Sequence, residues 1–168
     1  MYSNANRNDD LNTLIILYEN ESRINLDGDL YKNTWLSKPT TLGDVAFIQI
    51  FKIIQKKIKE ISFGEKLHYN DESFKLKYDL FMNEINKNKL IEKVCTALQS
   101  GTNTKKDVAI LILLELANSQ RINKILSSQE FMKIFIEHAN TIKRYSKDQY
   151  FFFKFFYFFI FSQNNLSF

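Results

Sequence analysis

Few side chains in this 168-residue chain have the type and spacing that catalysis or metal binding requires. The two histidines, His68 and His138, are far apart, and neither has another histidine or a cysteine near it. Zinc sites and nucleophile–base pairs need several such groups close together. The chain also lacks a glycine-rich phosphate loop, an HExxH motif and a nucleophile elbow. We therefore expect a protein that is not an enzyme and that needs no metal or cofactor.

The other reactive residue types favour structural roles. Cys95 is the single cysteine, which excludes an internal disulfide, and its place in an apolar stripe indicates an inert buried thiol. His138 falls beside an apolar face, in register with Ala97, so the pattern favours a packed histidine over a ligand. Acidic pairs such as Asp27 with Asp29 lie in predicted loops, where solvated turn roles dominate.

Composition and charge indicate the fold class and the kind of partner. Four glycines and one proline are too few for the many turns of an all-β protein, so we predict helices and no β-sheet. The net charge of +4 is mild. Lys52, Lys56, Lys57 and Lys59 cluster on one predicted helix, but Glu60 follows at once. We interpret this run as a solvated helix face and expect no nucleic-acid partner.

Apolar stripes at helical spacing predict seven to eight helices. They cover about residues 11–18, 41–63, 72–86, 88–99, 105–117, 119–126, 128–143 and 147–161. Four of them begin at a serine or threonine that is followed three positions later by an acidic or amide residue, a capping-box pattern. The predicted pairs are Thr41 with Asp44, Thr104 with Asp107, Ser127 with Glu130 and Ser146 with Gln149.

The predicted helix 105–117 is apolar almost all round its axis. An amphipathic surface helix keeps one polar side, whereas a helix that is hydrophobic on every side is buried. We therefore expect this helix to be the most buried element of the fold.

A faint internal repeat connects the last helices. A shift of 41 residues aligns Leu90-Ile91 with Phe131-Met132 and Lys106-Asp107 with Lys147-Asp148. A period near 40 residues with helical units is typical of a helical solenoid, in which each repeat buries its apolar face by stacking on the next.

The order of elements from residue 88 onward resembles an armadillo-type repeat. The segment Leu90 to Gly101 resembles the third helix of that family and the turn after it, and Val108 to Asn118 resembles its second helix. Residues 121–127 would then link to the next third helix, 128–143, although Ser127-Ser128 replaces the glycine expected there. The resemblance implies an all-α, armadillo-like solenoid fragment whose third helices line a surface that binds proteins or peptides.

Two polar rows mark that implied surface. One row is Glu92, Thr96 and Gln99, followed by Asn103, and the same register 41 residues later gives Lys133, Glu137, Asn140 and Arg144. Their amide and charged groups suit hydrogen bonding to an extended peptide. The competing interpretation is that each amphipathic helix simply needs one wetted side.

The two ends of the chain complete the predicted organisation. We expect a disordered N-terminus over 1–10, one helical domain over 11–161 and a tail over 162–168, in a cytoplasmic protein because no signal segment opens the chain. The aromatic run Tyr150–Phe161 is too short to cross a membrane, since twelve helical residues reach only about 18 Å. We expect it to pack on a missing repeat or a partner, or to drive self-association.

The aromatic run also supports an alternative function. The chain would then be a small membrane-associated or organellar assembly subunit, or a truncated piece of a larger solenoid protein. A third interpretation is that part of this run is not coding sequence.

Overall fold

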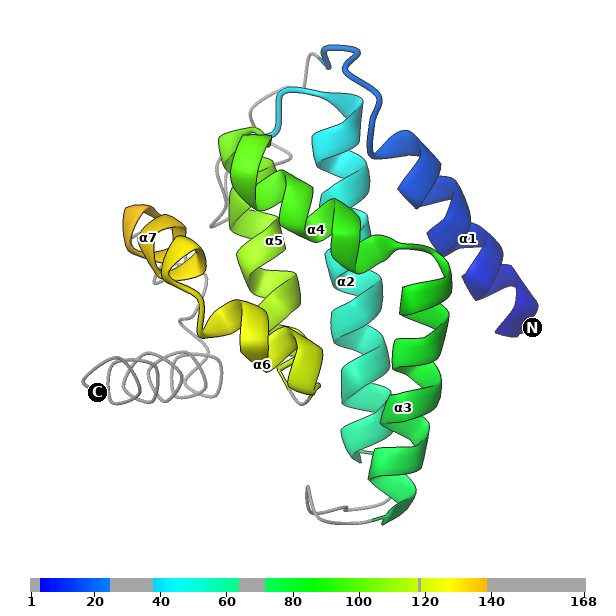
Figure 1. The fold of residues 1–168 in the computed structure, drawn as a ribbon. Helices are drawn as coiled ribbons and strands as arrows, with labels where there is room; N and C mark the ends of the chain where they lie inside the picture. Colours follow the sequence, from blue (N-terminus) through cyan, green and yellow to red (C-terminus); the bar gives the residue numbers. More distant parts are fainter. Residues whose placement is uncertain (1–3, 25–37, 64–71, 118, 139–168) are drawn as a thin grey trace. The chain divides into compact units, whose positions relative to one another are not determined.

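The computed structural model describes residues 4–24, 38–63, 72–117 and 119–138 of the chain (Figure 1). Within these ranges every regular element is an α-helix, and the only extended pairing is an isolated bridge between Arg23 and Thr41. The predicted all-helical class is therefore confirmed for the described residues. The predicted helix 147–161 and the aromatic run within it lie outside them.

The chain divides into two compact units, and the single domain expected over 11–161 stays a prediction. The first unit comprises Met1–Ile24 with Pro39–Thr96, and the second comprises Asn25–Lys38 with Ala97–Phe168. The first contains α1 (Asn4–Leu17), α2 (Leu42–Phe63) and α3 (Glu72–Lys87), and the second contains α5 (Asn103–Glu115), α6 (Gln120–Leu126) and α7 (Gln129–Glu137). Helix α4 (Leu90–Ser100) begins in the first unit and ends in the second.

Helix α2 is the central element of the first unit. It packs against α1 and against α3, and α2 and α3 run antiparallel side by side (Figure 1). Its core side chains recur at helical spacing and are at most 8% exposed. They are Phe47, Ile50, Phe51, Ile54, Ile58 and Ile61. Because one stripe of six large apolar residues is removed from water, burial of this face is the main stabilising contribution of α2.

A complete capping box fixes the start of α2. The Thr41 hydroxyl accepts a hydrogen bond from the Asp44 backbone N–H at 3.1 Å, and the Asp44 carboxylate accepts from the Thr41 N–H at 3.3 Å. The same carboxylate also accepts from the Thr40 N–H at 2.9 Å. The predicted cap is confirmed, and α2 is helical through Phe63, the last described residue before 64–71. Asp44 is buried, but each of these donors offsets the cost of removing its charge from water.

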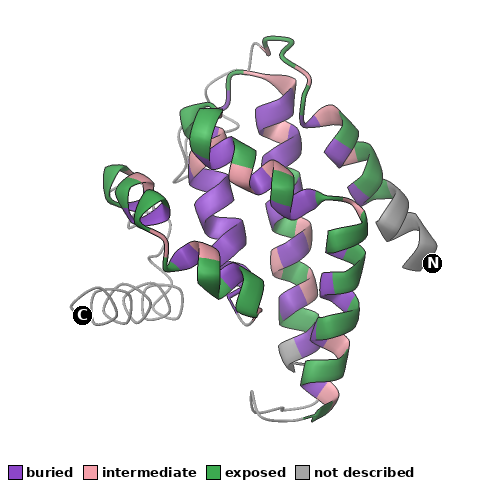
Figure 2. Cartoon of the chain, viewed as in Figure 1, coloured by how far each residue is buried: buried purple, intermediate pink, exposed green. Residues whose placement is uncertain are grey.

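Helix α5 is buried around its whole circumference in Figure 2, as its sequence predicted. Every residue from Asp107 to Ala117 is buried. The helix begins two residues earlier than predicted, because Thr102 rather than Thr104 is the N-cap and accepts from the Lys105 N–H at 3.2 Å. This choice leaves the Thr104 hydroxyl to donate to the Lys38 carbonyl oxygen at 3.1 Å.

Two other helix starts differ from the sequence-based boundaries. Helix α7 is capped by Ser128, whose hydroxyl accepts from the Phe131 N–H at 3.2 Å, rather than by Ser127. Helix α1 begins at Asn4, so residues 4–10 are helical where the sequence predicted a disordered N-terminus. A helix whose C-terminal turns are anchored by Leu11, Ile15 and Tyr18 extends outward easily, because each added residue gains a hydrogen bond without a new nucleation step.

Candidate functional site

The predicted partner-binding residues of the first polar row share one side of α4. Glu92, Thr96 and Gln99 are all exposed, and their spacings of four and three residues place them along one face. The opposite side of α4 carries Ile91, Val94 and Leu98, which are at most 5% exposed. The helix is therefore sharply amphipathic, and its polar face is turned to solvent.

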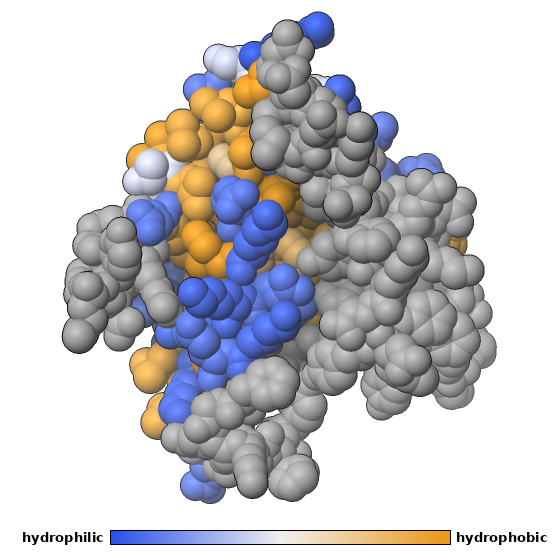
Figure 3. Space-filling view, turned by 180° about the vertical axis from the view of Figure 1, so that it is seen from behind, coloured by the Kyte–Doolittle hydropathy of each residue, from blue (hydrophilic) through white to orange (hydrophobic). Residues whose placement is uncertain are grey.

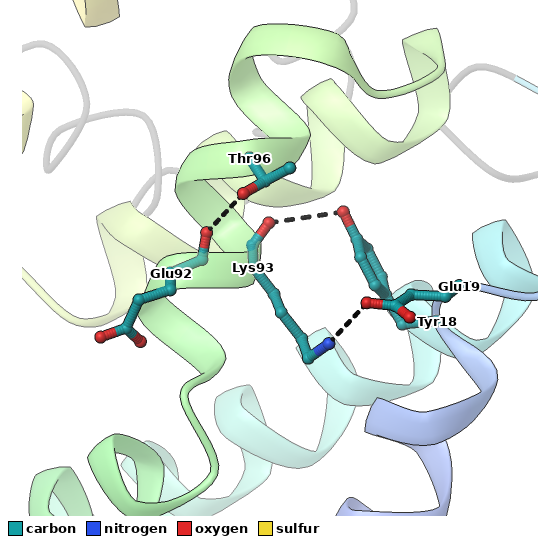
Figure 4. Close-up of polar contacts among 5 residues, drawn as sticks. All are labelled: Tyr18, Glu19, Glu92, Lys93 and Thr96. Carbon is teal, nitrogen blue, oxygen red and sulfur yellow. Dashed lines mark hydrogen bonds and ion pairs between the residues drawn. The ribbon is translucent and has the colours of Figure 1, made fainter.

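Thr96 is constrained within this face. Its hydroxyl donates to the Glu92 carbonyl oxygen at 2.9 Å, one turn earlier on the same helix (Figure 4). With its proton used in this way, the hydroxyl offers a partner an acceptor rather than a donor. Glu92 adds carboxylate acceptors beside it, while the Gln99 amide can both donate and accept. The face therefore suits a ligand that presents N–H groups.

A second cluster joins α4 to the residues that follow α1, within the first unit. The Lys93 ammonium lies 3.0 Å from a Glu19 carboxylate oxygen and 5.6 Å from the centre of the Tyr18 ring. The Tyr18 hydroxyl in turn donates to the Lys93 carbonyl oxygen at 3.4 Å (Figure 4). Tyr18 also packs edge to face on Phe47, with ring centres 4.8 Å apart. These contacts hold the first turn of α4 on the α1–α2 pair.

The environment of Tyr18 keeps its phenol neutral. Burial, and to a smaller extent the nearby carboxylates of Glu19 and Asp44, raise the pKa of Tyr18 from an ordinary value of 10.0 to about 12. A phenol with such a pKa does not act as a base near neutral pH. The chemistry of this cluster is therefore structural, and its exposed ion pair contributes little, about 0–1 kcal/mol.

Helix α7 carries the described part of the second polar row. Lys133 and Glu137 are exposed, whereas Phe131, Met132 and Phe135 on the other side are buried. Ile136 lies among the exposed positions and is 60% exposed, so this face mixes charge with one large apolar side chain. The remaining predicted residues, Asn140 and Arg144, lie outside the described residues.

A histidine–carboxylate pair lies in the second unit. His138, which ends α7, places its Nδ1 atom 2.5 Å from a carboxylate oxygen of Asp107 on α5. The Asp107 side chain is fully buried and that of His138 is 11% exposed. Sequence reasoning expected His138 to pack beside an apolar face and expected Asp107 to close a helix cap. Their actual pairing joins residues 31 positions apart, and no local sequence signal marks such a contact.

The other candidates for chemistry are easily placed. Within the described ranges, no group of three or more metal-binding side chains lies together. Cys95 is half-buried, so it is less enclosed than the sequence indicated. His68 lies outside the described residues. None of the helices described combines the length and the hydropathy needed to span a bilayer.

The structure thus places five of the seven predicted partner-binding residues on exposed helix faces, three on α4 and two on α7. Sequence reasoning missed the contacts of Tyr18, Glu19 and Lys93, because they connect segments about 75 residues apart. Comparison of the chain with family models, with curated proteins and with solved structures finds no match in any of the three.

Proposed function

We propose that this chain is a non-catalytic interaction module of the armadillo-like type, which binds a peptide or partner protein on the exposed sides of α4 and α7. The observation that carries the proposal is the sharp division of α4. Its apolar residues are buried, and Glu92, Thr96 and Gln99 form an uninterrupted exposed polar row. In an armadillo-like arrangement α4 and α7 take the place of third helices and α5 that of a buried second helix.

The chemistry of these faces suits recognition of backbone amides. A peptide in extended conformation presents N–H and C=O groups that pair with side-chain amides and carboxylates. Gln99 can satisfy both kinds of group, while Glu92 and Glu137 accept from N–H groups or from basic side chains. Lys133 adds a cationic donor for carbonyl or acidic groups. The faces therefore favour an extended ligand with basic or neutral side chains over a strongly acidic one.

The burial of α5 supports the same proposal. A helix that is buried on every side has no exposed surface that a ligand could contact. Its role is to support the helices whose surfaces are exposed. Its side chains from Val108 to Leu114 are at most 2% exposed. In solenoid proteins, buried helices of this kind support the helices that present the binding surface.

A selection followed by paired variants tests the proposal. Random peptides of about twelve residues displayed on phage are selected on the immobilised full chain, and the affinities of the enriched peptides are measured by fluorescence anisotropy. We expect the double variant Gln99→Ala with Glu137→Ala to weaken binding about tenfold or more, which corresponds to roughly 1.4 kcal/mol. Its stability should change by less than about 0.5 kcal/mol per site, because both residues are exposed.

The chain offers a matched control. Asn83→Ala with Glu84→Ala removes one amide and one carboxylate from exposed positions of α3. This variant should bind the selected peptides as the wild type does. If both double variants bind equally well, or if no peptide is enriched, the polar rows are ordinary wetted faces and the proposal is wrong.

A further inference from the structure

The outward face of α2 carries apolar residues at its N-terminal end and lysines toward its C-terminal end. Six residues follow one another at alternating spacings of three and four, on the side opposite the buried stripe. We call them the outer seam of α2; they are Leu42, Val45, Gln49, Lys52, Lys56 and Lys59. The first two are half-buried and the other four are exposed.

The spacing of the outer seam is that of any straight face of an α-helix, and it lets a second helix pack alongside. An average repeat of 3.5 residues keeps side chains in line with a second helix that packs alongside, as in coiled coils. Here the positions equivalent to a coiled-coil core are apolar at the N-terminal end of α2 and basic at its C-terminal end. The outer seam therefore has the geometry for a helix but lacks the uniform apolar character of a self-contained coiled coil.

The apolar and the basic residues of the outer seam lie at different positions along the axis of α2, and not on different sides of the helix. Figure 3 shows one face of the molecule, on which a hydrophobic area lies next to a hydrophilic area. Ile16 on α1, which packs against α2, is 77% exposed and adds to the apolar surface of the first unit. The three lysines of the outer seam extend over roughly 10 Å, and Glu60 is the acidic residue beside them.

We propose that the outer seam of α2 docks an acidic amphipathic helix of a partner protein. Apolar residues of that helix cover Leu42 and Val45, and its carboxylates, spaced by three and four residues, lie opposite Lys52, Lys56 and Lys59. Because both helices rise by the same distance per residue, the charges on the two remain in register over two turns. Charge complementarity of this kind gives specificity and faster association.

The separation of apolar and basic residues along the axis of α2 argues against two other anionic partners, a membrane surface and a nucleic acid. A helix that lies on a membrane needs an apolar stripe along its full length with basic residues on either side, and the outer seam has apolar residues at one end only. A nucleic acid offers phosphates along its whole backbone and gives no use to the apolar half.

This surface is separate from the polar rows on α4 and α7. The inference therefore does not depend on the proposed function, and variants in the outer seam leave Glu92, Gln99 and Glu137 intact. Loss of binding at one surface with retention at the other would show which of the two proposals fails.

The test uses the full chain and two designed helical peptides of three heptads. In each peptide, the residues that face the outer seam are leucines at one end and glutamates at the other end. One peptide has the leucines at its N-terminus and the other has them at its C-terminus, so that both parallel and antiparallel docking on α2 are tested. We expect one of them to bind with micromolar affinity, measured by fluorescence anisotropy, and to weaken as salt rises. The triple variant Lys52→Glu, Lys56→Glu and Lys59→Glu should reduce affinity at least tenfold.

Matched controls separate specific docking from general attraction. The variant Lys75→Glu, Lys87→Glu and Lys89→Glu makes the same change in net charge at exposed positions outside the outer seam and should keep nearly full affinity. Circular dichroism verifies that both triple variants remain folded. The inference is overturned if neither peptide binds, if a peptide with lysines in place of the glutamates binds equally, or if both triple variants lose affinity alike. It is also overturned if the chain binds phosphatidylserine vesicles or duplex RNA instead of the peptides, and the outer-seam triple variant abolishes that binding.

Discussion

The Nδ1 atom of His138, at the end of α7, lies 2.5 Å from the carboxylate of Asp107, which is fully buried in α5. A buried carboxylate that loses a hydrogen-bond partner keeps its desolvation cost without the compensation. We expect His138→Ala to lower the free energy of unfolding by about 1.5–3 kcal/mol, the range for hydrogen bonds to charged groups. Urea denaturation followed by circular dichroism measures this change.

A double-mutant cycle identifies the source of that loss. Asp107→Asn removes the charge, so His138→Ala should cost clearly less when it is combined with Asp107→Asn than it does in the wild type. His138→Gln, which can still donate an N–H to the carboxylate, should recover part of the stability. Equal costs of His138→Ala in both backgrounds would mean that the two side chains are neighbours without energetic coupling.

The close approach of Gly43 to the turn after α1 gives a second prediction. The Gly43 N–H donates to the Asn20 carbonyl oxygen at 2.9 Å, and a Cβ atom at this position would lie 2.2 Å from the Tyr18 carbonyl oxygen. That distance is far inside van der Waals contact with backbone, so α1 or α2 must shift. We expect Gly43→Ala to lower the melting temperature and to cost about 2 kcal/mol or more. Gln49→Ala, at an exposed position of the same helix, should change stability by less than about 0.5 kcal/mol.

Tyr18 should make stability depend on pH in the alkaline range. Its pKa is raised to about 12 in the folded chain and is near 10.0 when unfolded. Below pH 10 the phenol is protonated in both states. Between pH 10 and 12 the unfolded chain releases this proton and the folded chain keeps it, so the free energy of unfolding falls as pH rises.

Comparison with Tyr18→Phe isolates this contribution. Other tyrosines and the lysines titrate in both proteins and cancel in the difference. The stability advantage of the wild type over Tyr18→Phe, measured by urea denaturation, should therefore shrink steadily from pH 10 to about pH 12. A constant difference over that range would show that Tyr18 titrates alike in the folded and unfolded chains.

Local patterns predicted most of the described helices. The Thr41–Asp44 pair and the apolar stripe after it were sufficient to define α2, because a capping box and helical periodicity both act over a few residues. The burial of α5 followed in the same way from an apolar run with no polar side. The exposed polar row on α4 followed from spacing alone.

Contacts between distant segments were not predictable. Thr102 and Thr104 are equally good caps by sequence, and the choice between them follows the contacts of Thr104 with Lys38 and of Asp107 with His138. The cluster of Tyr18, Glu19 and Lys93 has no local signature either. Such pairs depend on how helices pack, and a single sequence does not contain that information in any short window.

The turn between α3 and α4 contains a strained residue. Lys89 has a φ angle of 54°, in the left-handed region where a side chain crowds the following carbonyl group. Glycine adopts this conformation without that cost, although it also makes the unfolded chain more flexible. We expect Lys89→Gly to stabilise the chain by about 0.5–1 kcal/mol, measured as a raised urea midpoint at unchanged slope. A lower midpoint would mean that the Lys89 side chain makes contacts worth more than the strain.

The central position of α5 gives the sharpest test of the fold. Leu111 is fully buried, and the residues on both sides of it along the helix are fully buried as well. A carboxylate there has no partner and costs several kcal/mol, which is comparable to the whole stability of a small domain. We expect Leu111→Asp to abolish cooperative folding of the second unit, detected as loss of helical circular dichroism and of protection from proteolysis between Ala97 and His138.

The same change at Ile136 is the control, because that side chain is 60% exposed. Ile136→Asp should leave the melting temperature within a few degrees of the wild type. Retained folding in Leu111→Asp would show that α5 is open to water and that the burial of this helix, on which the proposed module depends, is wrong.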